Sequence, residues 1–295
     1  MDETFEEHRR LLLGLGYRLL GSMWDAEDVV QEAWLRWMRT DRSQIREPRA
    51  FLVTVVSRLA LDQLRSARVS REAYTGPWLP EPVDGRAFGP LETAELRDTL
   101  SYATLHMMER LSPPERAVFV LREAFDLPYD RIAGILGSPA ATCRQWHHRA
   151  VAHLSRDSER FTAEPSDHAE LLTRFLAAAR DGDLTALTEL LAEDAIAYND
   201  GGGKVRAALR PIIGRDDVLA FVTGLMSRYP LQEAHLTQAN GEPAIWTVIG
   251  GQRQLAAFDI RAGRIHAIYG VLNPDKLTRI PAAPCRGRRT ESVRP

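Results

Sequence analysis

The sequence predicts a multidomain protein in which two all-α domains, a helical bundle and a helix-turn-helix domain, precede an α+β domain. Apolar residues recur at helical spacing over most of residues 1–160. A proline-rich segment interrupts this pattern at 74–90, and Glu164-Pro165-Ser166 marks another boundary. Beyond residue 195, short alternating runs bounded by Gly, Asn or Asp indicate antiparallel strands and hairpins. Helices followed by strands are typical of an α+β domain, and 295 residues suffice for two or three domains.

Composition excludes several classes of protein. With 44% apolar and 26% charged residues the chain resembles ordinary soluble proteins, and its formal net charge of −2 gives no overall attraction to nucleic acid. Cys143 and Cys285 are isolated, which argues against a disulfide framework and structural zinc. The charged start MDETFEEHRR is unlike a signal peptide, and no apolar run reaches the roughly 18 residues of a membrane span. We therefore expect a cytoplasmic protein without membrane contact, metal or cofactor.

Residues 25–39 predict an amphipathic helix with Asp25 as its N-cap. Its apolar residues recur at i, i+3, i+4, i+7 and i+8 and form one stripe, which we expect to be core: Val30, Ala33, Trp34, Trp37 and Met38. The opposite face is polar, with Asp28, Gln31, Glu32 and Arg36. On residue pattern alone, a solvated acidic face is the simplest interpretation of this side.

A second, basic helix is expected after Pro48. Its charged residues are Arg49, Arg58, Arg65 and Arg68, with Asp62 as the only acid. Four prolines and three glycines then mark residues 74–90 as a linker that is too stiff to be featureless. Helices are expected to resume by Leu91.

Residues 127–154 have the form of a helix-turn-helix. The first helix has an inner stripe of Tyr129, Ile132, Ala133 and Leu136, and Gly137 allows the turn. The second helix packs back through Cys143, His147, Ala150 and Leu154. Its other face offers side chains able to read base edges or meet phosphates in a major groove: Arg144, Gln145, His148 and Arg149. An αα-hairpin within a bundle would give a similar pattern.

The stretch NDGGGK, residues 199–204, raises the question of a phosphate-binding loop. A Walker A loop requires glycine where Tyr198 stands and a hydroxyl residue where Val205 stands, so the motif fails at both ends. A turn in which glycines supply positive φ is the better interpretation. Lys204 and Lys276 are the only lysines among 38 basic residues, which hints at a need for a compact ammonium at both places.

The blocks YRLLGSMWDAEDVVQEAWLRW and PRAFLVTVVSRLALDQLR, followed by a linker and the helix-turn-helix, resemble the extracytoplasmic-function (ECF) sigma factors. The resemblance implies a region-2 domain at 1–72, a linker at 73–104 and a region-4 domain at 105–160. It also implies binding to core RNA polymerase and promoter-specific initiation without chemistry of its own.

The resemblance assigns roles to residues already singled out. Asp28, Gln31, Glu32 and Leu35 would dock on the β′ clamp helices of the polymerase, and region 4 would meet the β flap. The basic helix would hold the −10 element of promoter DNA, with Arg49, Thr54, Arg58 and Arg65 as candidates. The second helix of the helix-turn-helix would read the −35 element. This helix departs from the family in having few basic residues at 146–153, so we expect weak phosphate contacts there.

Residues 166–278 resemble a SnoaL-like cone, and 279–295 would be a disordered tail. The sigma subgroup with this extension shows three short motifs, all present here. They are Trp78-Leu79-Pro80-Glu81-Pro82 in the linker, Asp200-Gly201-Gly202-Gly203-Lys204, and Asn273-Pro274-Asp275-Lys276-Leu277.

We therefore expect the three motifs to form an intramolecular contact through which the third domain tunes activity. Glu81 would be the ionic partner of a lysine, and burial of Trp78 and Leu79 would contribute most, because an exposed pair adds only about 0–1 kcal/mol. The alternative is that the linker motif is only a stiff spacer.

Two other functions compete with this view. The cone would bind a small-molecule signal, or would be an enzyme of cyclase or isomerase type using Asp259, His266, Tyr269 or Asp200. A ligand-sensing repressor would also contain a helix-turn-helix, but it leaves the first seventy residues unexplained.

Overall fold

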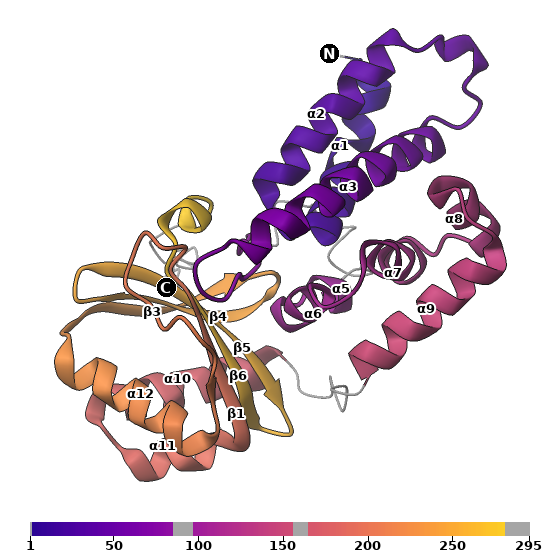
Figure 1. Ribbon diagram of the computed structural model, residues 1–295. Helices are drawn as coiled ribbons and strands as arrows, with labels where there is room; N and C mark the ends of the chain where they lie inside the picture. Colours follow the sequence, from indigo (N-terminus) through magenta and orange to yellow (C-terminus); the bar gives the residue numbers. More distant parts are fainter. Residues whose placement is uncertain (1, 85–96, 156–164, 281–295) are drawn as a thin grey trace, which may run out of the picture.

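The computed structural model describes residues 2–84, 97–155 and 165–280. Two helical domains precede an α+β domain, as the sequence predicts, and they lie on one side of the molecule with the α+β domain on the other (Figure 1). The expected helix start at Leu91 and the tail beyond Ile280 lie outside the described residues.

The first domain is a bundle of three long helices with one short 3₁₀ turn. Its elements are α1 (Glu3–Leu20), α2 (Met23–Arg39), η1 (Arg42–Gln44) and α3 (Pro48–Glu72). Trp37 is buried as predicted, and Trp34 is half-buried against Phe5. Two details of the prediction are wrong. Ser22, not Asp25, caps α2, because the Ser22 hydroxyl accepts the Asp25 amide at 3.2 Å; and Met38 faces solvent rather than the core.

The second domain contains the predicted helix-turn-helix. Its elements are α5 (Arg97–Leu100), α6 (Tyr102–Met108), α7 (Pro113–Phe119), a π-helical turn η3 (Val120–Ala124), α8 (Tyr129–Leu136) and α9 (Ala140–Ser155). Gly137 ends α8 at φ +64°, the left-handed conformation that the sharp turn needs. Cys143, Ala150 and Leu154 are buried and hold α9 against the rest of the domain.

The third domain is a curved sheet with helices on one face. Its elements are α10 (Pro165–Asp181), α11 (Leu184–Leu190), β1 (Leu191–Asp200), β2 (Ile212–Ile213), α12 (Arg215–Arg228), β3 (Leu231–Ala239), β4 (Glu242–Ile249), β5 (Gln252–Arg261), β6 (Arg264–Val271) and η4 (Pro274–Leu277). The strand order is β2-β1-β6-β5-β4-β3. The sequence prediction missed α12 and expected only antiparallel strands, whereas β1 and β6 pair in parallel.

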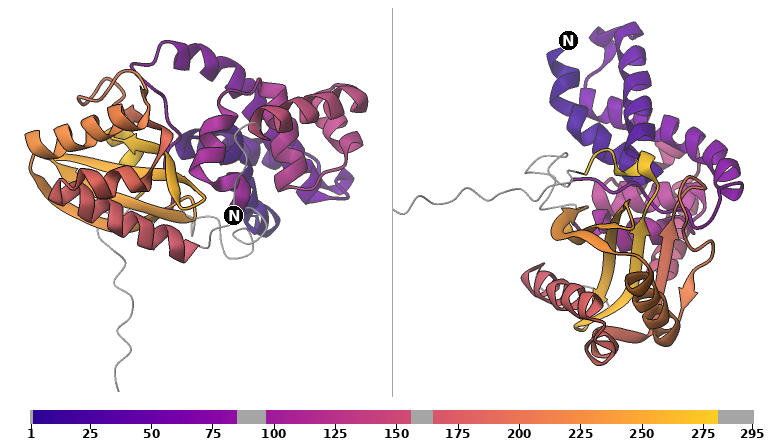
Figure 2. Two further views of the ribbon diagram at one scale, coloured as in Figure 1. Left: turned by 90° about the horizontal axis from the view of Figure 1, so that it is seen from below. Right: turned by 90° about the vertical axis from the view of Figure 1, so that its left-hand side faces the viewer.

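The two faces of this sheet have different neighbours. Helices α10, α11 and α12 cover one face, with Phe175, Val218 and Phe258 in the core between them. The N-terminal helices lie on the opposite side of the sheet (Figure 2). There Tyr102 of α6 packs in one cluster with Leu79 of the linker and Trp246 and Tyr269 of the sheet. The interface between the domains is therefore a second apolar core.

Candidate interdomain clamp and recognition surfaces

The linker segment 78–82 lies extended between the three domains, and its backbone is bonded to each of them. The Tyr17 hydroxyl of α1 donates to the Glu81 carbonyl at 2.7 Å, and the Tyr102 hydroxyl of α6 donates to the Pro80 carbonyl at 2.5 Å. The Leu79 amide donates to Asp200 of β1 at 3.0 Å. Leu79, Pro80, Glu81 and Pro82 are buried, so this segment forms part of the interdomain core rather than a spacer.

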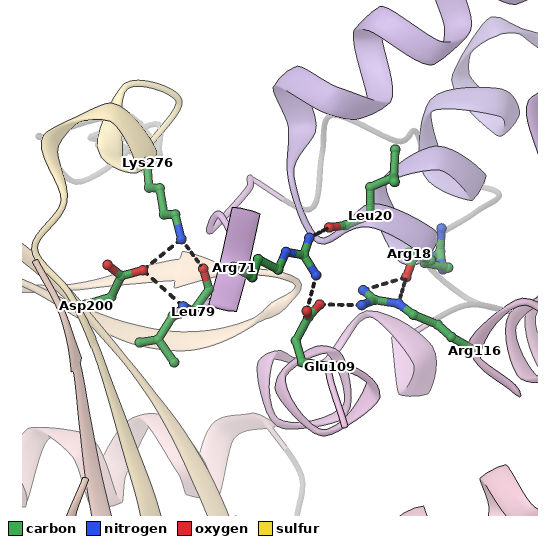
Figure 3. A network of polar contacts seen from close by, with 8 residues as sticks. All are labelled: Arg18, Leu20, Arg71, Leu79, Glu109, Arg116, Asp200 and Lys276. Atoms are coloured by element: carbon green, nitrogen blue, oxygen red, sulfur yellow. Dashed lines mark hydrogen bonds and ion pairs between the residues drawn. The ribbon is translucent and has the colours of Figure 1, made fainter. Parts of the chain in front are cut away.

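Asp200 and Lys276 form the centre of this contact, which we call the interdomain clamp: Tyr74, Trp78, Leu79, Asp200, Asn273 and Lys276. The Asp200 carboxylate accepts from the Lys276 ammonium at 2.7 Å and from the Tyr74 hydroxyl at 2.6 Å. Lys276 also donates to the Leu79 carbonyl at 2.5 Å, so one ammonium joins η4, β1 and the linker (Figure 3). Asp200 is fully buried, and burial lowers the pKa of Lys276 while the Asp200 charge opposes that shift.

Trp78 connects the clamp to a second charge network. Two cations contact its ring, with the Arg71 guanidinium 3.7 Å and the Lys276 ammonium 4.1 Å from the ring centroid. Arg71 of α3 also pairs with Glu109, which in turn pairs with Arg116 of α7 (Figure 3). Trp78 therefore connects the third domain, through Lys276, to the ion pairs that link the two helical domains, through Arg71.

Glu81 has a different partner from the one the sequence predicts. It contacts neither lysine through a hydrogen bond or ion pair; its carboxylate pairs with Arg279 at 3.2 Å and accepts the Met23 amide at 2.7 Å at the start of α2. Burial raises the pKa of Glu81, and the Met23 amide and the Arg279 charge oppose this rise. Arg279 also donates to Glu27 of α2 at 2.6 and 2.9 Å, although the sequence prediction places it in the tail.

The glycine-rich loop is a turn, as predicted. Gly202 has φ +59° and lies so close to Asn273 and Tyr74 that a Cβ would collide with both. The neighbours Gly201 and Gly203 complete the turn, and Lys204 pairs with Asp275 beside the exposed Pro274. That pair is 51% and 62% exposed, whereas the side chains of Lys276 and Asp200 are 13% and 0% exposed. The two lysines of the chain thus form one surface pair and one buried pair.

The predicted polymerase-binding residues lie on the outer face of α2. Asp28 and Gln31 are exposed, Glu32 pairs with Arg36, and Leu35 is 41% exposed. Trp24 and Met38 extend this face at helical spacing and are 55% and 48% exposed. Sequence reasoning missed Trp24, although its spacing of four residues from Asp28 places it on this face. The predicted docking residues and these exposed apolar side chains therefore share one face of α2.

The four predicted −35 residues share one exposed face of α9. Arg144, Gln145, His148 and Arg149 are all exposed, with Arg144 5.5 Å from the Tyr129 ring centroid. His147 is not on this face, since its ring bonds to Tyr129 and Glu123. The arrangement fits a helix that enters a major groove.

The four predicted −10 residues are not equally available. Arg49 is exposed, Arg65 pairs with Asp62, and the Thr54 hydroxyl donates to the Ala50 carbonyl at 2.8 Å. Arg58 donates to the carbonyls of Ile135 and Gly134 at the end of α8, at 3.0 and 2.8 Å. In this arrangement the guanidinium of Arg58 is bound to the helix-turn-helix domain.

Comparison with known proteins agrees with this geometry. Residues 4–69 match the family model of sigma-70 region 2, and residues 102–154 match that of sigma-70 region 4. The chain is 39% identical to the ECF RNA polymerase sigma factor SigJ of Mycobacterium tuberculosis, over 97% of this chain and 95% of SigJ. This chain belongs to the ECF sigma factors.

Further similarities cover the third domain of this ECF sigma factor as well. SigI of Mycobacterium tuberculosis is 34% identical over 94% of both chains. The crystal structure of Mycobacterium tuberculosis SigJ matches with a TM-score of 0.78 at 36% identity, covering 95% of this chain and 99% of that one. The ECF sigma factor therefore has two helical sigma domains and a SnoaL-like α+β domain, and it binds RNA polymerase and directs promoter-specific initiation.

The four residues considered for catalysis do not contact one another as an acid–base pair; each has a different partner. Asp259 pairs with Arg261, His266 with Asp194, and Tyr269 stacks on Tyr198 at 5.6 Å between ring centroids. Asp200 belongs to the clamp. Across the described ranges, no helix of this sigma factor has the length and hydropathy to cross a membrane.

Proposed function

We propose that the SnoaL-like domain regulates this ECF sigma factor in cis, by clamping the linker between regions 2 and 4. The observation that supports it is the buried Asp200–Lys276 pair, which holds both the amide and the carbonyl of Leu79. Regions 2 and 4 bind different promoter elements, so a fixed linker fixes the spacing that promoter DNA must match.

We further propose that the clamped arrangement is a resting state. Arg58, one of the four candidates for the −10 element, is bound to α8 of region 4, and this contact must break before Arg58 reaches DNA. Arg279, three residues after the clamp residue Lys276, contacts α2: it bonds to Glu27, and its guanidinium lies 4.6 Å from the Trp24 ring centroid. Release of the clamp would therefore let region 4 move away from Arg58 and would free one end of the polymerase-binding face.

The remaining assignments follow the same proposal. The face of α2 with Asp28, Gln31 and Leu35 would dock on the β′ clamp helices, and region 4 would contact the β flap. Arg144, Gln145, His148 and Arg149 would contact the −35 element, as their exposure on one face allows. Sigma activity requires no catalysis, so we assign this chain no enzymatic role, and it would act in the cytoplasm with RNA polymerase.

Run-off transcription at limiting core polymerase tests the proposal. The full chain is compared with Lys276→Met, which breaks the buried pair, and with Lys204→Met, which breaks the exposed one. We expect at least threefold more transcript from Lys276→Met per folded molecule, and no change from Lys204→Met. Equal yields from all three proteins would refute regulation by the clamp, and a lower yield from Lys276→Met would show that the clamped arrangement is not the resting state.

A further inference from the structure

A cleft of about 480 Å³ opens into the helix-covered side of the third domain, away from the clamp. Helix α12, the ends of β1 and β4 and the start of β5 surround it. Its wall is largely apolar, with Phe221, Leu225, Ile249 and Leu272 among the lining residues. This volume and lining are typical of sites for small organic ligands.

The polar side chains that line the cleft include several hydrogen-bond donors. Asn199 is 6% exposed and lines the cleft, and its buried side-chain nitrogen has no hydrogen-bond partner within the described residues. Gly270 lies opposite Asn199 on β6 and leaves room for the Asn199 side chain. A Cβ on residue 270 would lie only 2.9 Å from the Asn199 amide oxygen. A buried donor without an acceptor costs free energy, so this amide is suited to an acceptor that enters the cleft.

The charge of the lining selects the kind of acceptor. Arg206 and Arg228 line the cleft, and neither has an ion-pair partner in the part of the chain that the structure describes. No Asp or Glu is among the lining residues there. Two arginines and a buried amide suit the carboxylate group of a ligand, and the apolar wall suits a hydrocarbon chain or ring attached to it.

The cleft and the clamp meet at the end of β1. Successive side chains of a strand point to opposite faces, so Asn199 faces the cleft and Asp200 faces the clamp. Leu272, another lining residue, donates its amide to the Asp200 carbonyl at 2.8 Å. A ligand that moves Asn199 or Leu272 would therefore displace the backbone that positions the Asp200 carboxylate.

We propose that this cleft binds a small amphipathic carboxylate and that its occupation alters the interdomain clamp. The site itself stands on the geometry of the third domain, whereas the effect on the clamp rests on the proposed function. Both parts are measured without polymerase, so their failure is distinct from failure of the transcription test.

Binding is measured by calorimetry on the full chain, with decanoate as the probe and decanol as its neutral counterpart. We expect saturable binding of one decanoate, at least tenfold tighter than decanol. Arg206→Gln with Arg228→Gln should weaken decanoate binding at least tenfold, and Gly224→Phe should abolish it, because a Cβ at Gly224 meets no atom within 4 Å and the larger side chain fills the cleft. Arg253→Gln is the matched control, since Arg253 is exposed between two lining residues and points to the other face.

Absence of saturable decanoate binding, equal affinity for decanol, or equal loss in Arg253→Gln would overturn the site. The effect on the clamp is measured by hydrogen exchange at the Leu79 amide, which donates to Asp200. Saturating decanoate should change this exchange rate at least threefold in the wild type and leave it unchanged in Gly224→Phe. Binding with no change at Leu79 would overturn the coupling.

Discussion

Lys276→Met removes the charge that compensates a fully buried carboxylate and keeps most of the aliphatic chain against Trp78. The Asp200 carboxylate would retain the Leu79 amide and the Tyr74 hydroxyl but would lose its counterion. Breaking a buried pair by removing one partner costs about 3–5 kcal/mol, and the partial exposure of Lys276 favours the lower end. The matched change Lys204→Met should cost about 0–1 kcal/mol, because both members of that pair are exposed.

Local opening of the clamp is the quantity to measure, because a multidomain chain has no single free energy of unfolding. Hydrogen exchange at the Leu79 amide reports that opening. A loss of about 3 kcal/mol corresponds to roughly a hundredfold loss of protection in Lys276→Met. The double variant Asp200→Asn with Lys276→Met leaves no unpaired charge. Its cost should therefore be smaller than the sum of the two single costs, by more than about 1 kcal/mol.

Two outcomes would refute this reasoning. Lys276→Met with less than a tenfold loss of protection, or with the same loss as Lys204→Met, would show that the buried pair does not hold the linker. Strict additivity of Asp200→Asn and Lys276→Met would show that the two side chains act independently, despite the 2.7 Å between them.

Three further predictions concern the same interface. Gly202→Ala should lower the hydrogen-exchange protection of the Leu79 amide at least about fivefold more than Gly137→Ala. Both positions have positive φ, but only a Cβ at 202 collides with Asn273, so equal effects would contradict the crowding. Burial and then the charge of Arg110 lower the pKa of His106 to about 4, from 6.5. Between pH 6.5 and 4 the imidazole of His106 is protonated in the unfolded chain but not in the folded chain. The stability of the interface, measured by hydrogen exchange, should therefore fall as pH falls through this window, by up to about 3 kcal/mol at pH 4. His106→Gln should flatten this dependence of stability on pH, and an unchanged dependence would exclude His106 as its cause. Leu79→Ala should reduce the free energy of local opening at its own amide by about 2–5 kcal/mol in hydrogen exchange, because its side chain is fully buried; a loss below about 1 kcal/mol would argue against a packed linker.

Local patterns were sufficient where a motif determines its own structure. The helix after Pro48, the turn at Gly137 and the positive φ values of the glycine-rich loop each depend on residues within a few positions of one another. Patterning was weaker where tertiary contacts decide. Met38 fits the apolar stripe of α2 as a sequence, yet it is exposed to solvent on the same face as Trp24 and Leu35.

By itself, the sequence determined the order of the domains, the helix-turn-helix, the family resemblance and the three motifs that meet in the clamp. Only the tertiary structure decided which charges pair. Lys276 is 76 residues from Asp200, and Arg279 is 198 residues from Glu81. Pairing over such separations depends on how β1, η4 and the linker come together, and no local spacing encodes it. Likewise, Arg58 is bound to α8 and Asn199 faces the cleft because of how whole elements pack, which residue type alone does not fix.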